Sequence, residues 1–188
     1  MEYWIYFICF VAIAFNLYWL LSYVCSDWGK YPPFIMSLGR SKYEVIRIAS
    51  EHLLKYEKSQ KIVDLGCGCG SLLLPLAKKF PQHQFVGIER DIVAYTLMKL
   101  FSYKYKNIKV VYGNFMKYEW QDYDVFLCYT GNEIATFISQ KIKKEAKEKA
   151  IIISETFKMP NLYLVKEIDT NTFGIPLKVF VYRVFQME

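Results

Sequence analysis

Hydrophobic and polar positions divide the chain into an uncharged amino-terminal run and a longer segment of mixed character. From Tyr3 to Ser26 the sequence YWIYFICFVAIAFNLYWLLSYVCS carries no charge. As a helix this run would extend about 36 Å, longer than the roughly 30 Å hydrocarbon core of a bilayer. Tyrosine and tryptophan gather toward both of its ends, as in the aromatic belts of membrane interfaces. The pattern predicts one transmembrane helix, an anchor over residues 1–26.

Two other interpretations of this run are weaker. A cleaved signal peptide would need a basic region before the apolar run and a small-residue cleavage site, and neither is present. A buried core helix would need apolar partners on every side. Because Lys30, Arg40 and Lys42 follow the run and no basic residue precedes it, the positive-inside rule predicts a single-pass membrane protein with the remainder of the chain in the cytoplasm.

Beyond a connector over residues 27–42, the pattern alternates between helical and strand periods. Residues 43–56 have the spacing of an amphipathic helix. Strands are predicted at 61–65, 85–89, 108–113, 123–129, 150–157, 161–168 and 177–184, with helices after Ser71, after Asp91 and near 132–147. Ser71 and Asp91 are the predicted helix caps. The last two strands leave no room for a helix, so they predict a hairpin. The fold class is therefore α/β: a doubly wound, mostly parallel sheet of seven strands with a carboxyl-terminal antiparallel hairpin, over residues 43–188.

The most distinctive stretch is VDLGCGCG, residues 63–70, between the first strand and the next helix. A metal site is disfavoured because Cys67 and Cys69 are one residue apart and the chain has only two histidines. A phosphate-binding P-loop would end in Gly-Lys-Ser or Gly-Lys-Thr, which is absent. The dinucleotide fingerprint G-x-G-x-x-G does not match either, because the glycines here are spaced G-x-G-x-G. The two cysteines are interpreted as small loop residues, with a reactive thiol as a minor alternative.

A tight glycine turn at the carboxyl end of a first parallel strand is a place where such sheets bind ligands. Gly66, Gly68 and Gly70 would let a ligand approach the backbone closely. Asp64 precedes the turn, where it can accept a hydrogen bond from an ammonium group. Glu89 ends the second strand, where a carboxylate can accept from both hydroxyls of a ribose. A nucleoside with a cationic, amino-acid-like tail fits these residues, which indicates S-adenosylmethionine as cofactor.

The motifs VDLGCGCG, VGIER, YGNF and YDVFLCY resemble those of the Rossmann-like S-adenosylmethionine-dependent methyltransferases. A narrower resemblance is carried by residues 112–145, by IIISETF and by VFVYRV, which are similar to the small protein lysine methyltransferases. That family includes broad-specificity archaeal enzymes and the mitochondrial enzyme that modifies the ATP synthase c-subunit. The resemblance covers about residues 30–185. Combined with the predicted anchor, it implies that the substrate is a lysine on a membrane-associated protein.

The resemblance also implies roles for individual residues. Asp64 and the three glycines would line the methionine end of the cofactor, Glu89 would bind the ribose, and Asn114 with Phe115 would flank the adenine. In the segment before the domain, interpreted as a linker and cofactor lid, Pro33, Phe34 and Ser37 correspond to the family pattern, whereas Met36 and Leu38 replace prolines. Ser37 is accordingly a candidate cofactor-binding residue. The family often has aspartate where Cys69 stands.

The methyl acceptor is expected at the mouth after the fourth strand. Tyr129 is the candidate catalytic residue, as a channel wall or hydroxyl acceptor, although a packing role is an equal alternative. Thr130 and Asn132 are the candidate substrate-channel residues. Methyltransferases of RNA, lipid or a small amine remain alternatives, as does a non-catalytic cofactor-binding membrane module. The net charge of +6 suits an anionic membrane surface and also permits RNA, so it does not discriminate between them.

Overall fold

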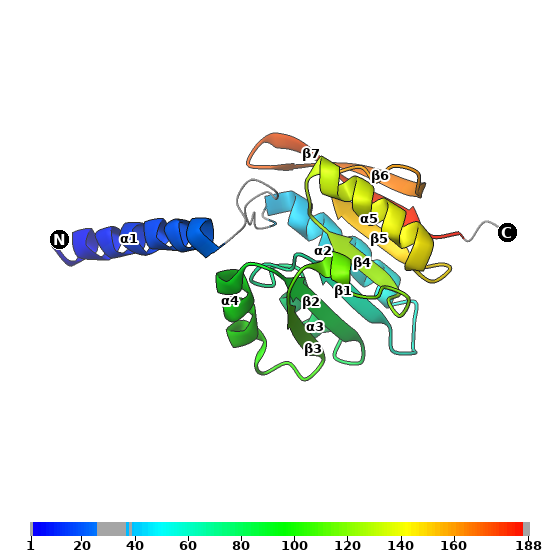
Figure 1. Cartoon of the computed structure of the whole chain (residues 1–188), viewed down its shortest axis with the longest axis horizontal. Helices are drawn as coiled ribbons and strands as arrows, with labels where there is room; N and C mark the ends of the chain where they lie inside the picture. The colour runs from blue at the N-terminus through cyan, green and yellow to red at the C-terminus, as the bar shows by residue number, and fades with distance from the viewer. Residues whose placement is uncertain (1, 26–36, 38, 186–188) are drawn as a thin grey trace.

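The computed structural model describes residues 2–25, 37 and 39–185 (Figure 1). The described elements, in chain order, are α1 (Glu2–Cys25), α2 (Gly39–Leu53), β1 (Lys61–Leu65), α3 (Leu73–Lys79), β2 (Gln84–Glu89), α4 (Ile92–Ser102), β3 (Ile108–Tyr112), the 3-10 helix η1 (Phe115–Lys117), β4 (Val125–Cys128), α5 (Asn132–Glu145), β5 (Ile151–Glu155), β6 (Tyr163–Thr172) and β7 (Ile175–Arg183). All seven strands expected from the sequence are present, and the hairpin strands are longer than expected.

The seven strands form one sheet in the order β3-β2-β1-β4-β5-β7-β6. Neighbouring strands from β3 to β5 pair in parallel, whereas β7 pairs antiparallel with both β5 and β6. Within the sheet, the first strand β1 is central, β2 and β3 follow on one side of it, and β4 is on the other side. This confirms the predicted doubly wound, mostly parallel sheet with an antiparallel hairpin at one edge.

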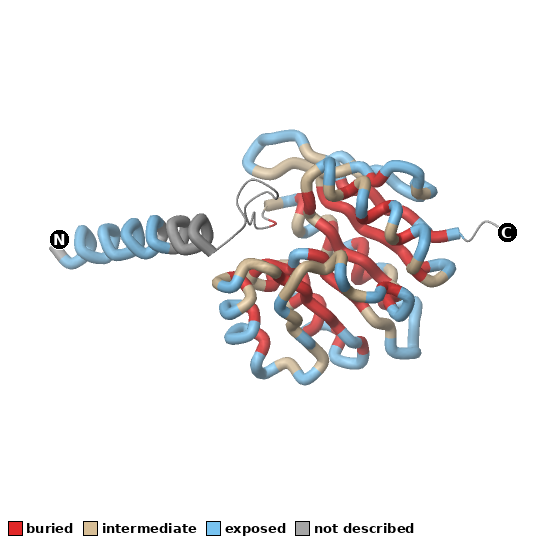
Figure 2. Tube along the Cα trace, viewed as in Figure 1, coloured by how far each residue is buried: buried red, intermediate tan, exposed pale blue. Residues whose placement is uncertain are grey.

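Helices cover both faces of the sheet, and each face has its own apolar cluster. On one face, strand residues such as Ile62 and Leu127 pack with side chains of α2, α3 and α4. On the other face, Phe126 and Ile152 pack with α5 and with the buried Trp120. Figure 2 shows the buried positions following the strands between these helical layers. Because β1, β2, β4 and β5 are buried on both faces, they contain continuous apolar runs rather than an alternating pattern.

The two predicted helix caps have different outcomes. Asp91 caps α4, because its side chain accepts hydrogen bonds from the backbone N–H groups of Val93 (3.0 Å) and Ala94 (2.8 Å). The prediction for Ser71 is wrong: α3 begins two residues later, with Leu72 at the N-cap position and no side-chain cap. The glycine turn itself supplies the missing acceptor, since the carbonyl of Gly70 accepts from the N–H of Leu74 at 3.0 Å.

Helix α1 projects away from the sheet domain (Figure 1). Its apolar side chains at positions such as Tyr3, Trp4 and Phe10 are exposed. Across residues 2–25, 37 and 39–185, no helix combines the length and apolarity needed to cross a bilayer. The predicted transmembrane helix over 1–26 therefore has no support from the described part of the chain.

Most of the predicted linker and lid lies outside the described residues. That includes Pro33, Phe34, Met36 and Leu38, so the comparison of this segment with the family pattern stays a prediction. Ser37 is described and buried. Helix α2 begins at Gly39, several residues before the predicted start at residue 43. The prediction missed its first turn because that turn contains mainly polar residues and the apolar spacing starts only at Val45.

Candidate active site

Four polar residues lie on one face of the sheet, at the carboxyl ends of neighbouring strands. Asp64 in β1 pairs in register with Gly87 of β2 and with Leu127 of β4. Glu89, Tyr129 and Glu155 each lie two positions beyond that level, on β2, after β4 and on β5. Because side chains alternate between faces with a period of two, all four share the face covered by α2 and α3. The topology therefore brings together residues that are distant in sequence.

The glycine turn after β1 adopts a left-handed backbone at Gly66, Gly68 and Gly70, with φ angles of 87°, 54° and 89°. Two of these glycines serve different purposes. A Cβ on Gly70 would overlap the sulfur of Met98 from α4, so this glycine allows close packing. A Cβ on Gly66 would meet no atom of the described residues within 4 Å. The backbone there borders open space, which is what a closely approaching ligand requires.

Cys67 is buried and packs against β2. A Cβ added to Gly87 would come within 2.6 Å of its sulfur, so the loop thiol occupies the space above that glycine. Burial raises the pKa of Cys67 well above its ordinary value. The thiol is therefore protonated and unreactive. Within the described residues, no group of three or more His, Cys, Asp or Glu side chains is arranged to hold a metal ion.

Glu89 ties the end of β2 to the glycine turn. Its Oε2 accepts from the backbone N–H of Gly68 at 2.8 Å, and its Oε1 accepts from Arg90 and Asp91 at 2.7 Å each. Burial raises the pKa of Glu89, although these backbone N–H groups act in the opposite direction. Each carboxylate oxygen has further lone pairs. Glu89 can therefore fix the turn and still accept hydrogen bonds from a ribose.

Asp64 is buried at the centre of this group of acids. Burial, followed by the nearby carboxylates of Glu89 and Glu155, raises the pKa of Asp64 to about 8. Burial and the neighbouring carboxylates thus disfavour the ionised form of Asp64. A cationic neighbour would stabilise that form and would therefore bind favourably here. Its position beneath the glycine turn agrees with the predicted place for the ammonium end of the cofactor.

The predicted adenine contacts also lie at this edge. Asn114 and Phe115 follow β3 directly, and the N–H of Gly113 donates to the carbonyl of Glu89 at 2.8 Å. The Asn114 side chain caps η1 by accepting from the N–H of Met116 at 2.9 Å. Phe115 is partly buried, and its carbonyl accepts from the indole N–H of Trp120 at 3.2 Å. Both candidates are thus held next to Glu89.

The predicted acceptor side lies over β4 and β5. Tyr129 is partly buried and stacks on Phe157, with ring centroids 6.0 Å apart. Thr130 is buried, and its hydroxyl has no hydrogen-bond partner among the described residues. Asn132 starts α5 at an exposed position. Only Tyr129 and Thr130 are therefore enclosed at this mouth.

Ser37, predicted as a cofactor contact, lies beside Glu155. Burial raises the pKa of Glu155, while hydrogen bonds from Ser41 and Ser37 lower it in part. The Ser41 hydroxyl donates to Oε1 of Glu155 at 2.5 Å. Glu155 itself was missed by the sequence interpretation. Its place near the end of the fifth strand was visible in the sequence, but the register that puts it on the same face as Asp64 was not.

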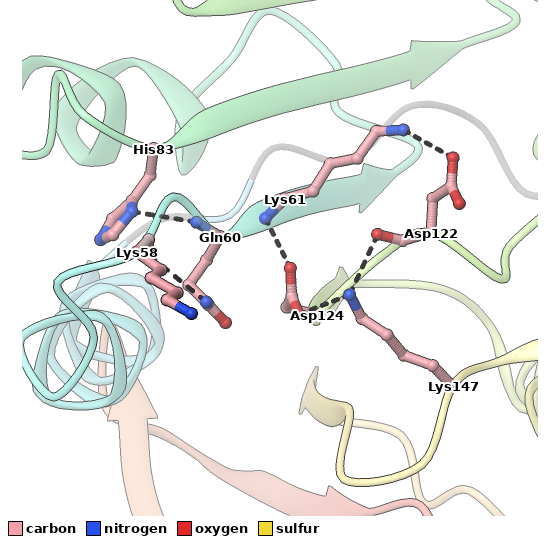
Figure 3. Close-up of polar contacts among 7 residues, drawn as sticks. All are labelled: Lys58, Gln60, Lys61, His83, Asp122, Asp124 and Lys147. Carbon is pink, nitrogen blue, oxygen red and sulfur yellow. Dashed lines mark hydrogen bonds and ion pairs between the residues drawn. The ribbon is translucent and has the colours of Figure 1, made fainter.

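At the amino-terminal ends of the parallel strands, called the amino edge, the acidic side chains have cationic partners; the opposite ends are called the carboxyl edge. Asp124 accepts from the backbone N–H of Lys61 at 2.8 Å and forms an ion pair with Lys147 at 2.5 Å. Lys61 in turn pairs with Asp122 at 3.1 Å, as Figure 3 shows. At the carboxyl edge, by contrast, none of the ion pairs within the described residues involves Asp64, Glu89 or Glu155.

Comparison with known proteins identifies the family. The sequence model described as the ANTKMT methyltransferase domain matches residues 64–166, more than half of the chain. The chain belongs to this family. The resemblance to the small protein lysine methyltransferases agrees with that assignment.

More distant relatives carry other names. A tRNA (guanine-N(7)-)-methyltransferase of Vanderwaltozyma polyspora is 30% identical over 60% of this chain and 42% of its own length. The protein of the same name from Kluyveromyces lactis is 28% identical over 75% of this chain and 49% of its own length. The chain thus spans about half the length of the curated relatives it matches.

Solved structures establish the fold. An RNA methyltransferase from Salinibacter ruber in complex with S-adenosyl-L-homocysteine superposes with a TM-score of 0.64, at 13% identity, covering 79% of this chain and 93% of that one. The fold is therefore the Rossmann-like methyltransferase fold. With the match to a methyltransferase family model, the cofactor is S-adenosylmethionine, as predicted. The residues present fit that cofactor: open space beside Gly66, lone pairs on Glu89, and a carboxyl at Asp64 that favours a cation.

Proposed function

We propose that this protein is an S-adenosylmethionine-dependent protein-lysine N-methyltransferase. The observation that carries the proposal is the match of residues 64–166 to the ANTKMT methyltransferase domain, which fits the resemblance to small protein lysine methyltransferases. The site at the carboxyl edge supports it, because its side chains suit a cationic cofactor and a cationic acceptor.

When bound, the cofactor would supply a methyl group on a sulfonium; the acceptor nitrogen would bond to the methyl carbon as the carbon–sulfur bond breaks, and the cofactor would leave as a neutral thioether. The protein's own contribution is positioning, because orienting the two reactants supplies much of the rate. Glu89 and the glycine turn hold the nucleoside half, and Asp64 lies beneath the cationic half. Tyr129 and Phe157 form an aromatic wall on the acceptor side, where they exclude water.

A lysine acceptor must lose a proton before it attacks. Its ordinary pKa of about 10.4 means that deprotonation at neutral pH costs about 4–5 kcal/mol. An aromatic, water-poor channel beside a sulfonium lowers that cost through desolvation and like-charge repulsion. The buried carboxylates of Glu89 and Glu155 also make the floor of the site electronegative. This attracts an ammonium and repels the phosphates of a nucleic acid.

The proposal is tested by incubating the full chain with methyl-labelled S-adenosylmethionine and with separated membrane, protein and RNA fractions. We expect label in methyl-lysine after acid hydrolysis of protein. Tyr129→Ala should lower the turnover number at least tenfold and change the affinity for S-adenosylhomocysteine less than threefold. The control is Tyr163→Ala, an exposed tyrosine on the hairpin, which should leave both quantities unchanged.

A second candidate function is methylation of RNA. It is favoured by the names of the relatives that match this chain, which are tRNA (guanine-N(7)-)-methyltransferases, and it is permitted by the net charge of +6. Label recovered as methylated guanine, with none in lysine, would replace the lysine proposal with this one.

We also propose that α1 attaches the protein to a membrane and that the catalytic domain faces the cytoplasm. The support is the exposed apolar surface of α1 and the absence of charge from Tyr3 to Ser26. The tethered catalytic domain would then move only in a thin layer at the membrane surface, where the effective concentration of a membrane-bound substrate is higher. Membrane fractions washed with salt should retain the protein, and protease added to the cytoplasmic side should digest it. Release by salt alone would contradict this attachment.

A further inference from the structure

Glu155 has a buried carboxylate oxygen without a hydrogen-bond partner in the described part of the chain. The residue is 2% exposed. Its Oε1 accepts from the Ser41 hydroxyl, whereas its Oε2 has no hydrogen-bond partner among the described residues. A buried polar atom left without a partner costs free energy, more so when it belongs to an ionisable group. The position of Glu155 at the carboxyl edge suggests that a ligand supplies the missing donor.

The register of the strands separates Glu155 from the cofactor half of the site. Glu89 lies on β2, and β1 and β4 stand between it and the strand that carries Glu155. Three strand spacings correspond to about 14 Å across the sheet. A ribose at Glu89, with the rest of the cofactor over the glycine turn after β1, leaves the surface over β4 and β5 to a second molecule.

The surroundings of Glu155 define the chemistry of that second molecule. Tyr129 leaves the sheet next to it, at the same level and on the same face, and the charge of Glu155 contributes to raising the pKa of Tyr129, after burial. No ion pair within the described residues reaches Glu155. A buried acid whose Oε2 has no partner among the described residues, beside the stacked rings of Tyr129 and Phe157, forms a receptor for an alkylammonium group.

We propose that Oε2 of Glu155 binds the ammonium group of the methyl acceptor, so that Glu155 selects a cationic alkylamine and holds it beside Tyr129 before it loses its proton. Ser41 and Ser37 orient the carboxyl by donating to it. The inference rests on the proposed function, since it names the group through which that site recognises its substrate. It assigns Glu155 a binding role.

The test uses a minimal probe and needs no turnover. The full chain is saturated with S-adenosylhomocysteine and titrated calorimetrically with n-butylammonium, which mimics a lysine side chain, and with n-butanol, its neutral counterpart. Glu155→Gln should weaken n-butylammonium binding at least tenfold and leave n-butanol binding within twofold. Glu148→Gln, at an exposed position, is the matched control and should change neither affinity. Circular dichroism verifies that each variant is folded.

A second variant covers the case in which Glu155→Gln does not fold. Glu155→Asp keeps the charge but withdraws the oxygen by one methylene, and it should also weaken n-butylammonium binding. Equal n-butylammonium affinity in the wild type and in the folded variants would overturn the inference, even if lysine is methylated. A tenfold loss of S-adenosylhomocysteine affinity in Glu155→Gln would overturn it as well, because the oxygen would then serve the cofactor's own ammonium group. Label in RNA alone would count against the proposed function, and the titration would still decide the role of Glu155.

Discussion

The two edges of the sheet use their acids in opposite ways. At the amino edge, Asp124 is satisfied by a backbone N–H of Lys61 and by the ammonium of Lys147 (Figure 3). At the carboxyl edge, Asp64 and Glu155 are more deeply buried and have no ion pair within the described residues. The amino edge holds the strands together, whereas the carboxyl edge keeps acids at a cost in stability. Such a cost is typical of a site that awaits a cationic ligand.

The largest expected effect concerns the turn that forms the carboxyl edge. Gly70→Ala combines a positive φ with overlap at Met98, so it should lower the free energy of unfolding by about 2–5 kcal/mol. Gly66→Ala has a similar φ, but the new methyl would meet no described atom within 4 Å, so it should cost about 1–2 kcal/mol. Denaturant unfolding of the full chain measures both. Equal losses would show that packing against α4 does not require Gly70.

The next effect is on the pH dependence of stability. The folded-state pKa of Asp64, about 8, lies above its ordinary value of 3.8, so the folded protein without cofactor binds the extra proton between these values. The free energy of unfolding therefore decreases as pH rises from about 4 to about 8. Asp64→Asn removes this titration. The variant should be of the order of a few kcal/mol more stable than the wild type at pH 8 and similar to it at pH 4. Parallel unfolding curves across this range would contradict the account of Asp64.

A smaller loss is expected at the amino edge. Asp124→Ala leaves the N–H of Lys61 and the ammonium of Lys147 without their acceptor, and should cost about 1–3 kcal/mol in unfolding free energy. Asp122→Ala is the matched control, because that side chain is 73% exposed and should have almost no effect. If both substitutions lower the unfolding free energy equally, Asp124 has no special structural role, and the amino edge does not differ from the carboxyl edge in the way described.

The smallest effect is that of one partly exposed ion pair. Lys147→Ala removes the partner of Asp124, with side chains 39% and 22% exposed, and should cost about 0.2–1 kcal/mol. Because salt screens such a pair, the difference from the wild type should shrink between 0.05 M and 1 M sodium chloride. A loss that does not respond to salt would indicate packing of the lysine stem instead.

Features that depend on local sequence could be predicted, whereas features that depend on contacts between distant segments could not. The strands, the glycine turn, Asp91 as a cap and Glu89 at the end of β2 were predictable, because each depends on local periodicity or on spacing within one strand-turn-helix unit. Glu155 was not found, because its importance depends on the register that places β5 two strands from β1. The Ser71 cap failed for a related reason: a backbone carbonyl of the turn occupied the position that a side chain would take.

The central claim is that the carboxyl edge at β1 and β2 holds the nucleoside half of the cofactor. It is tested most directly by calorimetric titration of S-adenosylhomocysteine into the full chain. Glu89→Ala removes a charged acceptor and should weaken binding by about 1.5–3 kcal/mol, roughly ten- to 150-fold. Asp124→Ala, at the opposite edge, should leave the affinity of the folded protein within twofold. Unchanged binding in a folded Glu89→Ala variant, or equal losses in both variants, would contradict the account.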